Sequence, residues 1–339
     1  MAGVSLVIVN YRSARLAIEA IRSARANTRA PLQVIVVDNS DEADALRPHA
    51  DLLLAPNTNL GYGAAINRAR AKCDGDVLIA SNADVVFGDG AIDALVAADA
   101  DVAGPALFWD DAFTWILPPS ELHTTAEGID AAIASRSARW NRSRDRHRIR
   151  KRIAFWSLNR TTRLEAVSGA IMAIRMSAFD RIGGFDERFH LYFEEIDFQR
   201  RLRGGIAYVP TARCRHIYNQ SAAASPSSAA EYATSEMQYL EKWGGARVAR
   251  LIKSIEKAGA AVQRNPIGGD IPIERDGLIV EASPLPAFHT AAGHFPKSQA
   301  VAIPDEVWRA YRSDILYLRV IEAATARVLH VYAKTKIAP

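Results

Sequence analysis

Cysteine is scarce in this chain, and long apolar runs are absent. The 339 residues include two cysteines, Cys73 and Cys214, too few for a disulfide framework or a thiolate metal site. No run of about 18 apolar residues occurs, so a membrane-spanning helix is not expected. The first apolar run, Val4 to Val9, has no basic region before it, which argues against a signal peptide. We therefore expect a protein of the reducing cytoplasm.

Glycine-rich phosphate-binding loops are also missing. The first apolar run is followed by Asn10-Tyr11-Arg12-Ser13 instead of a glycine-rich turn. The pair Gly61-Tyr62-Gly63 lacks the third glycine of a dinucleotide-binding fingerprint, and no P-loop occurs. A bound diphosphate would therefore need another source of positive charge, for which a divalent cation is usual.

Positive charge is concentrated in one stretch. The chain is 49% hydrophobic and 24% charged, which excludes wholesale disorder, and its formal net charge is +4. Arg136 to Arg163 hold ten arginines and Lys151 against Asp145, a local charge of +10 that leaves −6 for the rest. Any anionic partner is expected near this stretch.

The basic stretch, residues 136–163, also contains Trp140, Phe155 and Trp156. Three interpretations stay open: a solvated helix, a patch for anionic lipid headgroups and a nucleic-acid surface. Arginine combined with aromatic residues favours contact with the inner face of the cell membrane. Nucleic acid is not expected as a partner, because no RNA-binding motif accompanies the charge.

Strand and helix patterns alternate over the first hundred residues. Short β-branched runs ended by polar residues predict strands buried on both faces, and alanine-rich periodic segments predict helices. Such alternation implies right-handed crossovers and a mostly parallel sheet, and hence an α/β fold. The expected strands are 4–9, 32–37, 52–55 and 76–80, and the expected helices are 14–26, capped by Ser13, and 61–71.

Polar residues follow the carboxyl ends of these strands. Asp38, Asn59, Asn82 and Asp84 all occupy such positions. In an open α/β sheet, this edge carries the ligand crevice. A single residue such as Asp38 could merely cap the next helix, but the row of four favours a ligand site.

The second half holds an acidic motif. A strand is expected from Glu165 to Arg175, and after it come Glu194, Glu195 and Asp197 among aromatic residues. Partial burial raises the pKa of a carboxyl group and makes it a usable general base. The alternative is an acidic helix start that simply complements the helix dipole.

The remaining chain divides into further segments. Residues 221–228 suggest a flexible loop over the acceptor, and 231–261 a helix interrupted at Gly244-Gly245. Prolines and glycines after Asn265 mark a linker to a small β-rich appendage with a hairpin of 315–321 and 328–332. We expect a nucleotide-sugar-binding half at 1–105, an acceptor half at 106–264 and the appendage at 265–339, for which glycan binding and oligomer contact are both open roles.

Five motifs, in this order, resemble the family 2 glycosyltransferases of the GT-A fold, especially the bacterial rhamnosyltransferase-like branch. The resemblance covers roughly residues 4 to 245. The motifs are Val7-Ile8-Val9-Asn10-Tyr11-Arg12, Val36-Val37-Asp38-Asn39-Ser40, Asn59-Leu60-Gly61-Tyr62-Gly63 with Asn67, Ser81-Asn82-Ala83-Asp84, and Gly183-Gly184-Phe185-Asp186-Glu187 through Glu194-Glu195-Ile196-Asp197.

The resemblance implies a donor site and a metal. Asp84 matches the last acid of the family's DxD motif, which binds Mn²⁺ or Mg²⁺ on the diphosphate, whereas Asn82 replaces the first acid. His216 matches a histidine that reaches the metal or the diphosphate. The implied nucleotide-sugar-binding residues are Tyr11, Arg12, Asp38, Asn59, Gly61, Asn67, Asn82 and Asp84.

The resemblance also implies an inverting transfer with one general base. Glu195 matches the position of that base, usually an aspartate, and the assignment between Glu195 and Glu194 stays open. The expected donor is dTDP-L-rhamnose, with a UDP-sugar second, and the expected acceptor is a glycan, typically lipid-linked. The alternatives are an inactive module that binds sugar nucleotides or glycans, and a basic nucleic-acid-binding protein.

Overall fold

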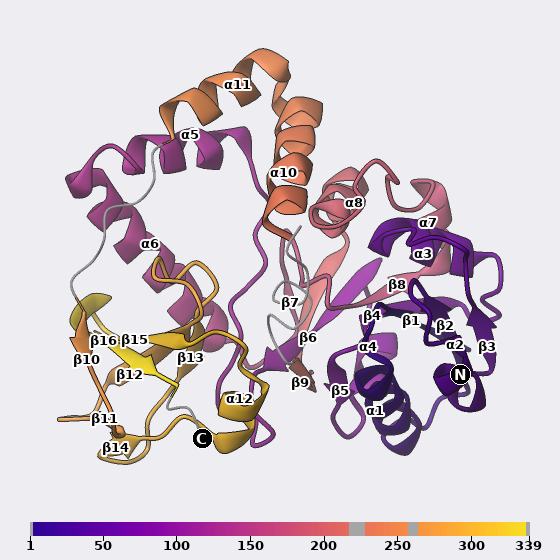
Figure 1. Ribbon diagram of the computed structural model, residues 1–339, viewed down its shortest axis with the longest axis horizontal. Helices are drawn as coiled ribbons and strands as arrows, with labels where there is room; N and C mark the ends of the chain where they lie inside the picture. Colours follow the sequence, from indigo (N-terminus) through magenta and orange to yellow (C-terminus); the bar gives the residue numbers. More distant parts are fainter. Residues whose placement is uncertain (1–2, 217–227, 257–263, 337–339) are drawn as a thin grey trace.

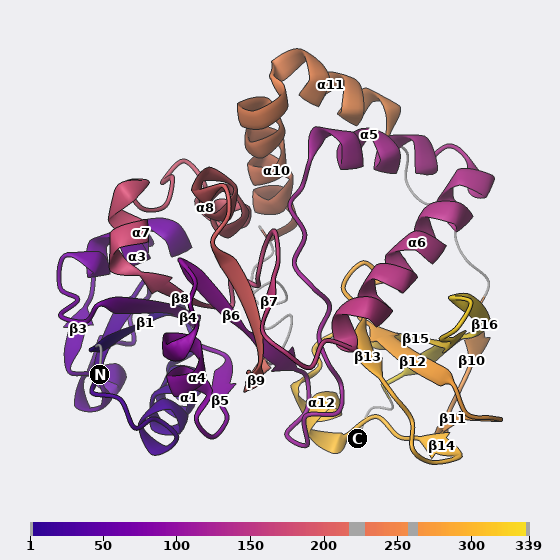
Figure 2. The ribbon, with the colours of Figure 1, turned by 180° about the vertical axis from the view of Figure 1, so that it is seen from behind.

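The computed structural model describes residues 3–216, 228–256 and 264–336. An α/β unit built on a large sheet and a smaller β-rich unit lie at opposite ends of the molecule, with long helices between them (Figures 1 and 2). Within the described residues, no helix is both long and apolar enough to cross a bilayer.

The large sheet has nine strands in the order β3-β2-β1-β4-β8-β6-β9-β5, with β7 beside β9. Strands β1 to β4 are parallel, β8 is antiparallel to β4 and β6, and β9 is parallel to β6 but antiparallel to β5 and β7. The sheet is therefore mixed beyond its first four strands. Its strands are β1 (Val4–Asn10), β2 (Leu32–Asp38), β3 (Leu52–Leu54), β4 (Val77–Asn82), β5 (Val85–Phe87), β6 (Val102–Phe108), β7 (Thr162–Arg163), β8 (Ile171–Arg175) and β9 (Ile206–His216).

Helices cover both faces of this sheet. From β1, Leu6 and Ile8 point into a core shared with α1 and α4, whereas Val7 points into a core shared with α3, α7 and α8. Burial on both faces explains why these strands are continuous apolar runs. The helices of this unit are α1 (Ala14–Ala26), α2 (Ala43–Leu46), the 3₁₀ turn η1 (Arg47–His49), α3 (Tyr62–Arg70), α4 (Ala91–Ala97), α7 (Met176–Arg181) and α8 (Glu194–Leu202).

Four helices form an arch between the two units (Figure 1). They are α5 (Thr125–Ala134), α6 (Ala138–Trp156), α10 (Ser228–Gly244) and α11 (Ala246–Ile255). Most of the basic stretch is thus the single helix α6, whose far end reaches the C-terminal sheet (Figure 2).

The C-terminal unit is a five-stranded sheet of order β10-β16-β15-β12-β13, with a separate pair β11-β14. Its longest strands, β15 and β16, form the hairpin that the sequence predicts. The elements are β10 (Asn265–Pro266), β11 (Ile271–Pro272), β12 (Leu278–Ser283), β13 (Ala292–His294), β14 (Ala300–Val301), α12 (Asp305–Ala310), β15 (Ile315–Glu322) and β16 (Arg327–Thr335).

The fold class is confirmed, with local corrections. The expected strand at 165–175 begins only at Ile171, because the preceding residues form the loop that reaches α8. Ser13 does not cap α1: its hydroxyl donates to Asn10 (3.0 Å), and the Ala14 N–H donates to Glu42 Oε2 (3.0 Å). The expected loop at 221–228 lies outside the described residues except for Ser228, which begins α10.

A buried ion network fixes α6 on the C-terminal sheet. Arg152 of α6 contacts one carboxylate oxygen of Glu281 (Nε to Oε1, 2.8 Å), and Arg319 of β15 contacts the other (Nε to Oε2, 2.5 Å). Arg319 also pairs with Asp145 of α6 (2.9 Å). Glu281 is fully buried and both arginines are 4% exposed, so each charge depends on its partners for stabilisation.

Glu281→Gln should lower the free energy of unfolding by about 3–5 kcal/mol, because it leaves two buried guanidinium groups without their shared carboxylate. Denaturant unfolding measures the change. The matched control is Glu121→Gln, which removes the partly exposed carboxylate that pairs with Lys151 of α6 (3.3 Å). It should change the free energy of unfolding little. Equal effects of the two substitutions would contradict the assigned role of the network.

Candidate active site

The first part of the site lies where β1 and β2 end. The Asp38 carboxylate is fully buried and accepts hydrogen bonds from Asn10 Nδ2 (2.9 Å), Ser40 Oγ (2.6 Å) and the Glu42 N–H (2.8 Å). Asp38 therefore holds the turn after β2 in place. Its contact with a nucleotide base stays a prediction, and the second acid at this position, Glu42, was missed by the sequence analysis.

Above this buried network lies an exposed aromatic and cationic pair. The Tyr11 side chain is 43% exposed, and the Arg12 guanidinium lies 5.2 Å from the centre of its ring. The Arg12 N–H donates to Ser40 Oγ (3.1 Å), which ties this pair to the Asp38 turn. The flat, accessible Tyr11 ring is a surface on which a base can stack.

The start of α3 is held against the loop that precedes α8. Gly61 has φ +80°, and a Cβ there would lie 2.1 Å from the His190 carbonyl oxygen, so only glycine fits. Its N–H donates to Asn59 Oδ1 (2.9 Å), and its carbonyl accepts from Asn39 Nδ2 (3.0 Å). Asn59 and Gly61 thus shape the backbone of this edge.

Asn67 of α3 bonds to the loop between α7 and α8, and its expected contact with the nucleotide sugar stays a prediction. Its side chain bonds to both the N–H and the carbonyl of Phe185 (2.9 Å each) and to Glu187 (2.9 Å). Because its polar atoms are engaged within the protein, Asn67 fastens α3 to the loop between α7 and α8.

Asp84 and His216 come together as the sequence predicts. The His216 Nε2 atom lies 3.3 Å from Asp84 Oδ1, because Val85 of β5 pairs with His216 at the end of β9. Both side chains are largely buried, and Asn82 lies two residues before Asp84 at the end of β4. Among the described residues, no three His, Cys, Asp or Glu side chains cluster closely enough to hold a metal unaided.

Two adjacent acids begin α8. Glu194 and Glu195 follow Tyr192 and Phe193, which have left-handed φ values of 69° and 68° that non-glycine residues rarely adopt. Glu194 is 5% exposed, and the buried Oε2 atom of each acid has no hydrogen-bond partner among the described residues. Burial, and then the neighbouring Glu195 charge, raises the pKa of Glu194 well above its usual range; burial also raises the pKa of Glu195.

Two glycines let these acids approach the neighbouring elements. A Cβ on Gly169 would lie 2.6 Å from Glu195 Cγ, and one on Gly63 would lie 2.9 Å from the Phe185 side chain and 3.5 Å from Glu194 Cβ. Larger residues would therefore displace the acids or the loop. This packing accounts for Gly169, which precedes β8.

Asp197 and Asp186 belong to a separate ion-pair cluster. Asp197 is fully buried and contacts Arg201 (2.8 Å) and Lys242 (2.5 Å). Asp186 contacts Arg188 (2.6 Å) and Lys242 (2.7 Å), and these hydrogen bonds, that of Arg188 first, hold its pKa below the usual range. Neither carboxylate resembles the partnerless oxygens of Glu194 and Glu195.

Tyr62 links the acidic groups of the site. Its hydroxyl donates to the Gly169 carbonyl (3.1 Å), and its pKa is raised first by burial and then by the charges of Glu194, Glu195 and Asp84. The charges of acids from α8 and from the β4–β5 turn thus both act on this phenol. Tyr62 belongs to the motif Asn59-Leu60-Gly61-Tyr62-Gly63, but no role for its hydroxyl was expected from the sequence.

Comparisons with known proteins match most of the large α/β unit. The model of the glycosyltransferase like family 2 matches residues 2–235. The N-acetylglucosaminyl-diphospho-decaprenol L-rhamnosyltransferase of Mycobacterium tuberculosis is 29% identical over 229 residues, which cover 59% of this chain and 71% of that relative.

Solved structures are more distant. GalNAc-T7 with UDP, GalNAc and Mn²⁺ has a TM-score of 0.47 at 17% identity, covering 64% of this chain but only 44% of that one. The mannosyltransferase PcManGT from Pyrobaculum calidifontis, solved with GDP-Man and Mn²⁺, has a TM-score of 0.46 at 14% identity, covering 74% of this chain and 70% of the other.

Glu194→Gln should stabilise the fold by roughly 1–3 kcal/mol at pH 8, because the neutral amide avoids the cost of ionising a buried carboxyl group, about 1.4 kcal/mol for each pKa unit. A raised pKa means that the folded state holds the proton more tightly than the unfolded chain. The wild type should therefore lose stability as pH rises above 4.5, the ordinary value, whereas the variant should not. Thermal unfolding across pH measures the difference.

Asp186→Asn is the control of opposite sign. Because the pKa of Asp186 is lowered, its ionised form stabilises the fold, so the substitution should destabilise at pH 8 and lose its effect as pH falls. If the stability gained through Glu194→Gln became smaller as pH rises, that result would contradict the burial of an ionisable group at this position.

Proposed function

The chain belongs to the glycosyltransferase like family 2, and on that premise we propose that it is an inverting transferase. It moves a sugar from a nucleoside-diphosphate sugar to a hydroxyl group of a glycan. The observation that carries this proposal is the pair of buried carboxyl groups at the start of α8, Glu194 and Glu195, each with an oxygen that has no hydrogen-bond partner among the described residues. The Asp84 end would hold the donor diphosphate, and the α8 end would receive the acceptor.

Asp84 and His216 fit a divalent cation. One carboxylate oxygen and one imidazole nitrogen suit Mn²⁺, and also Mg²⁺. Diphosphate oxygens and water would fill the remaining coordination positions of either ion. When bound, such an ion would offset the negative charge of the departing nucleoside diphosphate. Asn82 is neutral, so the segment Asn82-Ala83-Asp84 offers the cation one negative charge, whereas a motif with two acids would offer two.

Glu195 is the proposed general base. It is less buried than Glu194, and its Oε2 atom has no hydrogen-bond partner among the described residues that would compete for an acceptor hydroxyl. Glu195 takes the hydroxyl proton while the acceptor oxygen bonds to the anomeric carbon, and the bond to the diphosphate oxygen breaks on the opposite face. This single displacement inverts the anomeric carbon and needs one base. Burial keeps the pKa of Glu195 raised.

The donor proposed is dTDP-L-rhamnose, with a UDP-sugar as second choice, and the acceptor a lipid-linked glycan. The name of the mycobacterial relative supports this choice, because that protein transfers L-rhamnose to a diphospho-lipid acceptor. Tyr11 and Arg12 would stack on the base, and the Asp38 turn would hold them in position.

The proposed enzyme works in the cytoplasm at the inner face of the membrane, which four arginines of α6 would contact. Six of the eleven basic residues at 136–163 instead bind other parts of the protein. The basic stretch as a whole is therefore not available as a patch for anionic lipid headgroups. The arginine ridge that remains on α6 is exposed and has no acidic partner in the described chain. It consists of Arg139, Arg142, Arg146 and Arg150, spaced to share one helix face over about 16 Å.

Two substitutions separate donor binding from chemistry. Glu195→Gln should spare donor binding but cut transfer by several orders of magnitude, because no base remains. Asp84→Ala should weaken binding of the diphosphate and of Mn²⁺. Thermal shifts with dTDP-, UDP- and GDP-sugars, with and without Mn²⁺, measure binding, and product analysis measures transfer.

Glu187→Gln serves as control, since that exposed acid has a hydrogen bond to Asn67 and no other side-chain partner within the described ranges. Near-normal transfer by Glu195→Gln would move the base to Glu194. A wild type that binds donor but transfers to no acceptor would instead support the inactive binding module.

Replacing the four ridge arginines by glutamine should weaken binding to phosphatidylglycerol-containing vesicles at least about 100-fold at low salt, at about 1 kcal/mol for each arginine near the surface. Flotation with vesicles measures binding. The matched control replaces four exposed arginines of the first unit, Arg15, Arg22, Arg29 and Arg68, and should bind like the wild type. Equal losses in both variants would show a nonspecific charge effect and contradict the ridge.

A further inference from the structure

A short segment before β8, residues 167–170, connects the two ends of the proposed site. At the donor end, the Ala170 carbonyl accepts a hydrogen bond from the Asn82 N–H (2.9 Å), where β4 ends. At the other end, Gly169 packs directly against the proposed base, because a Cβ on it would lie 2.6 Å from Glu195 Cγ. This bridging segment therefore contacts both the donor end and Glu195.

Gln199 of α8 holds the first residue of the bridging segment. Its side-chain amide accepts a hydrogen bond from the Val167 N–H (2.7 Å) and donates to the Val167 carbonyl (2.9 Å). The same amide nitrogen donates to the Glu195 carbonyl (3.2 Å), one turn earlier on α8. Gln199 is 1% exposed, so water hardly competes for these hydrogen bonds. One side chain therefore ties the bridging segment to the backbone of the proposed base.

Tyr62 of α3 holds the bridging segment from a second direction. Its hydroxyl donates to the Gly169 carbonyl (3.1 Å), and its side chain is buried. Burial raises the pKa of Tyr62, so the hydroxyl keeps the proton that it donates. Because Gly169 has no side chain, the peptide that Tyr62 holds lies directly against Glu195. A shift of this peptide would therefore displace the proposed base by direct contact.

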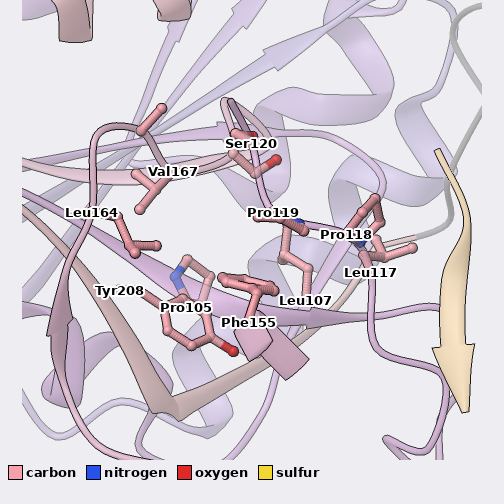
Figure 3. A pocket seen from close by; sticks show the side chains of 12 residues that line it. Pro105, Leu107, Leu117, Pro118, Pro119, Ser120, Phe155, Leu164, Val167 and Tyr208 are labelled. Carbon is pink, nitrogen blue, oxygen red and sulfur yellow. The ribbon is translucent and has the colours of Figure 1, made fainter. Parts of the chain in front are cut away.

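Packing confines the Val167 side chain as well. A Cβ on Gly104 of β6 would lie 2.4 Å from Val167 Cβ. Figure 3 shows Val167 and Leu164 on one side of a small cavity, with Leu117 and Pro118 on the other. The cavity volume of about 20 Å³ admits one water-sized group and leaves no room for a sugar ring. Val167 therefore contributes to packing, and the bridging segment is confined by α3, α8 and β6 together.

We propose that the bridging segment sets the position of Glu195 relative to the donor end, and that Gln199 and Tyr62 are positioning residues for this base. The inference rests on the proposed function and adds to it two residues that act through Glu195. Proton transfer needs the carboxylate within about 2.6–3.2 Å of the acceptor hydroxyl. A displacement of about 1 Å can lower the rate about 100-fold. Hydrogen bonds from two helices to one short segment restrict such a displacement.

Gln199→Met keeps an unbranched side chain of similar length and removes its three hydrogen bonds. With dTDP-L-rhamnose and a synthetic glycan on a lipid diphosphate, it should lower kcat about 10- to 100-fold, because the base is displaced. The donor KM should change little, since pairing with β1 holds Asn82 independently. Tyr62→Phe removes one hydrogen bond and keeps the ring, so it should lower kcat about three- to tenfold. This milder variant carries the test if Gln199→Met does not fold.

A double-mutant cycle tests whether the effect passes through the base. In a Glu195→Gln background, Gln199→Met should cause no further loss of kcat, because the carboxylate that it positions is already gone. Single-turnover transfer with radiolabelled donor measures the low rates of these variants. Equal losses in both backgrounds would contradict the positioning role.

Gln33→Met is the matched control, because Gln33 makes the same kind of contact at the opposite edge of the sheet. Its side-chain amide accepts from the Asp74 N–H (3.0 Å) and donates to the Lys72 carbonyl (3.0 Å), near the start of β2. The substitution should lower the melting temperature but leave kcat unchanged. A loss of kcat as large as that of Gln199→Met would overturn the inference.

The remaining outcomes separate this inference from the proposed function. Wild-type kcat in both Gln199→Met and Tyr62→Phe would overturn the inference and leave the proposed function intact. Near-normal transfer by Glu195→Gln, or no transfer by the wild type, would overturn the assignment of the base and this inference with it.

Discussion

The burial of two neighbouring carboxyl groups at the start of α8 is the constraint on which the site depends. Glu194 and Glu195 each have an oxygen without a hydrogen-bond partner in the described part of the chain, an arrangement that costs folding free energy. Two features of the surrounding structure keep the acids there. Gly63 and Gly169 give them room, and the left-handed backbone at Tyr192 and Phe193 directs the first turn inward. Because burial is what raises the pKa of both acids, a backbone at Tyr192 and Phe193 that left them exposed to water would return their pKa values toward the usual range.

The α/β class and the edge that carries the site could be predicted from the sequence, because β1 and β2 are apolar on both faces and end at polar residues. The pairing of Asp84 with His216 was predicted through a family resemblance, and the structure places them 3.3 Å apart. The roles of Asn67 and Tyr62 could not be predicted, because they depend on partners more than a hundred residues away in the chain. Periodicity within a segment carries no information about such contacts.

The acidic motif shows the same limit. Glu194, Glu195 and Asp197 are indistinguishable in a short sequence window, yet Asp197 is neutralised by Arg201 and Lys242 while its neighbours are not. Asp197 lies on the side of α8 that faces α10. Only the packing of α10, whose Lys242 arrives from 45 residues further along, decides which acid keeps a partner.

The ion network of Arg152, Glu281 and Arg319 has a consequence for how this molecule can be rearranged. Because α6 supplies Arg152 and also Asp145, which pairs with Arg319, the C-terminal sheet and α6 form one packed part, although residues of other elements come between them in the sequence. Grafting the sheet onto a different sugar-transfer scaffold would thus require carrying α6 along with it. Recombination that cuts the chain at the linker alone would separate Arg152 from Glu281 and leave that guanidinium group without its buried carboxylate.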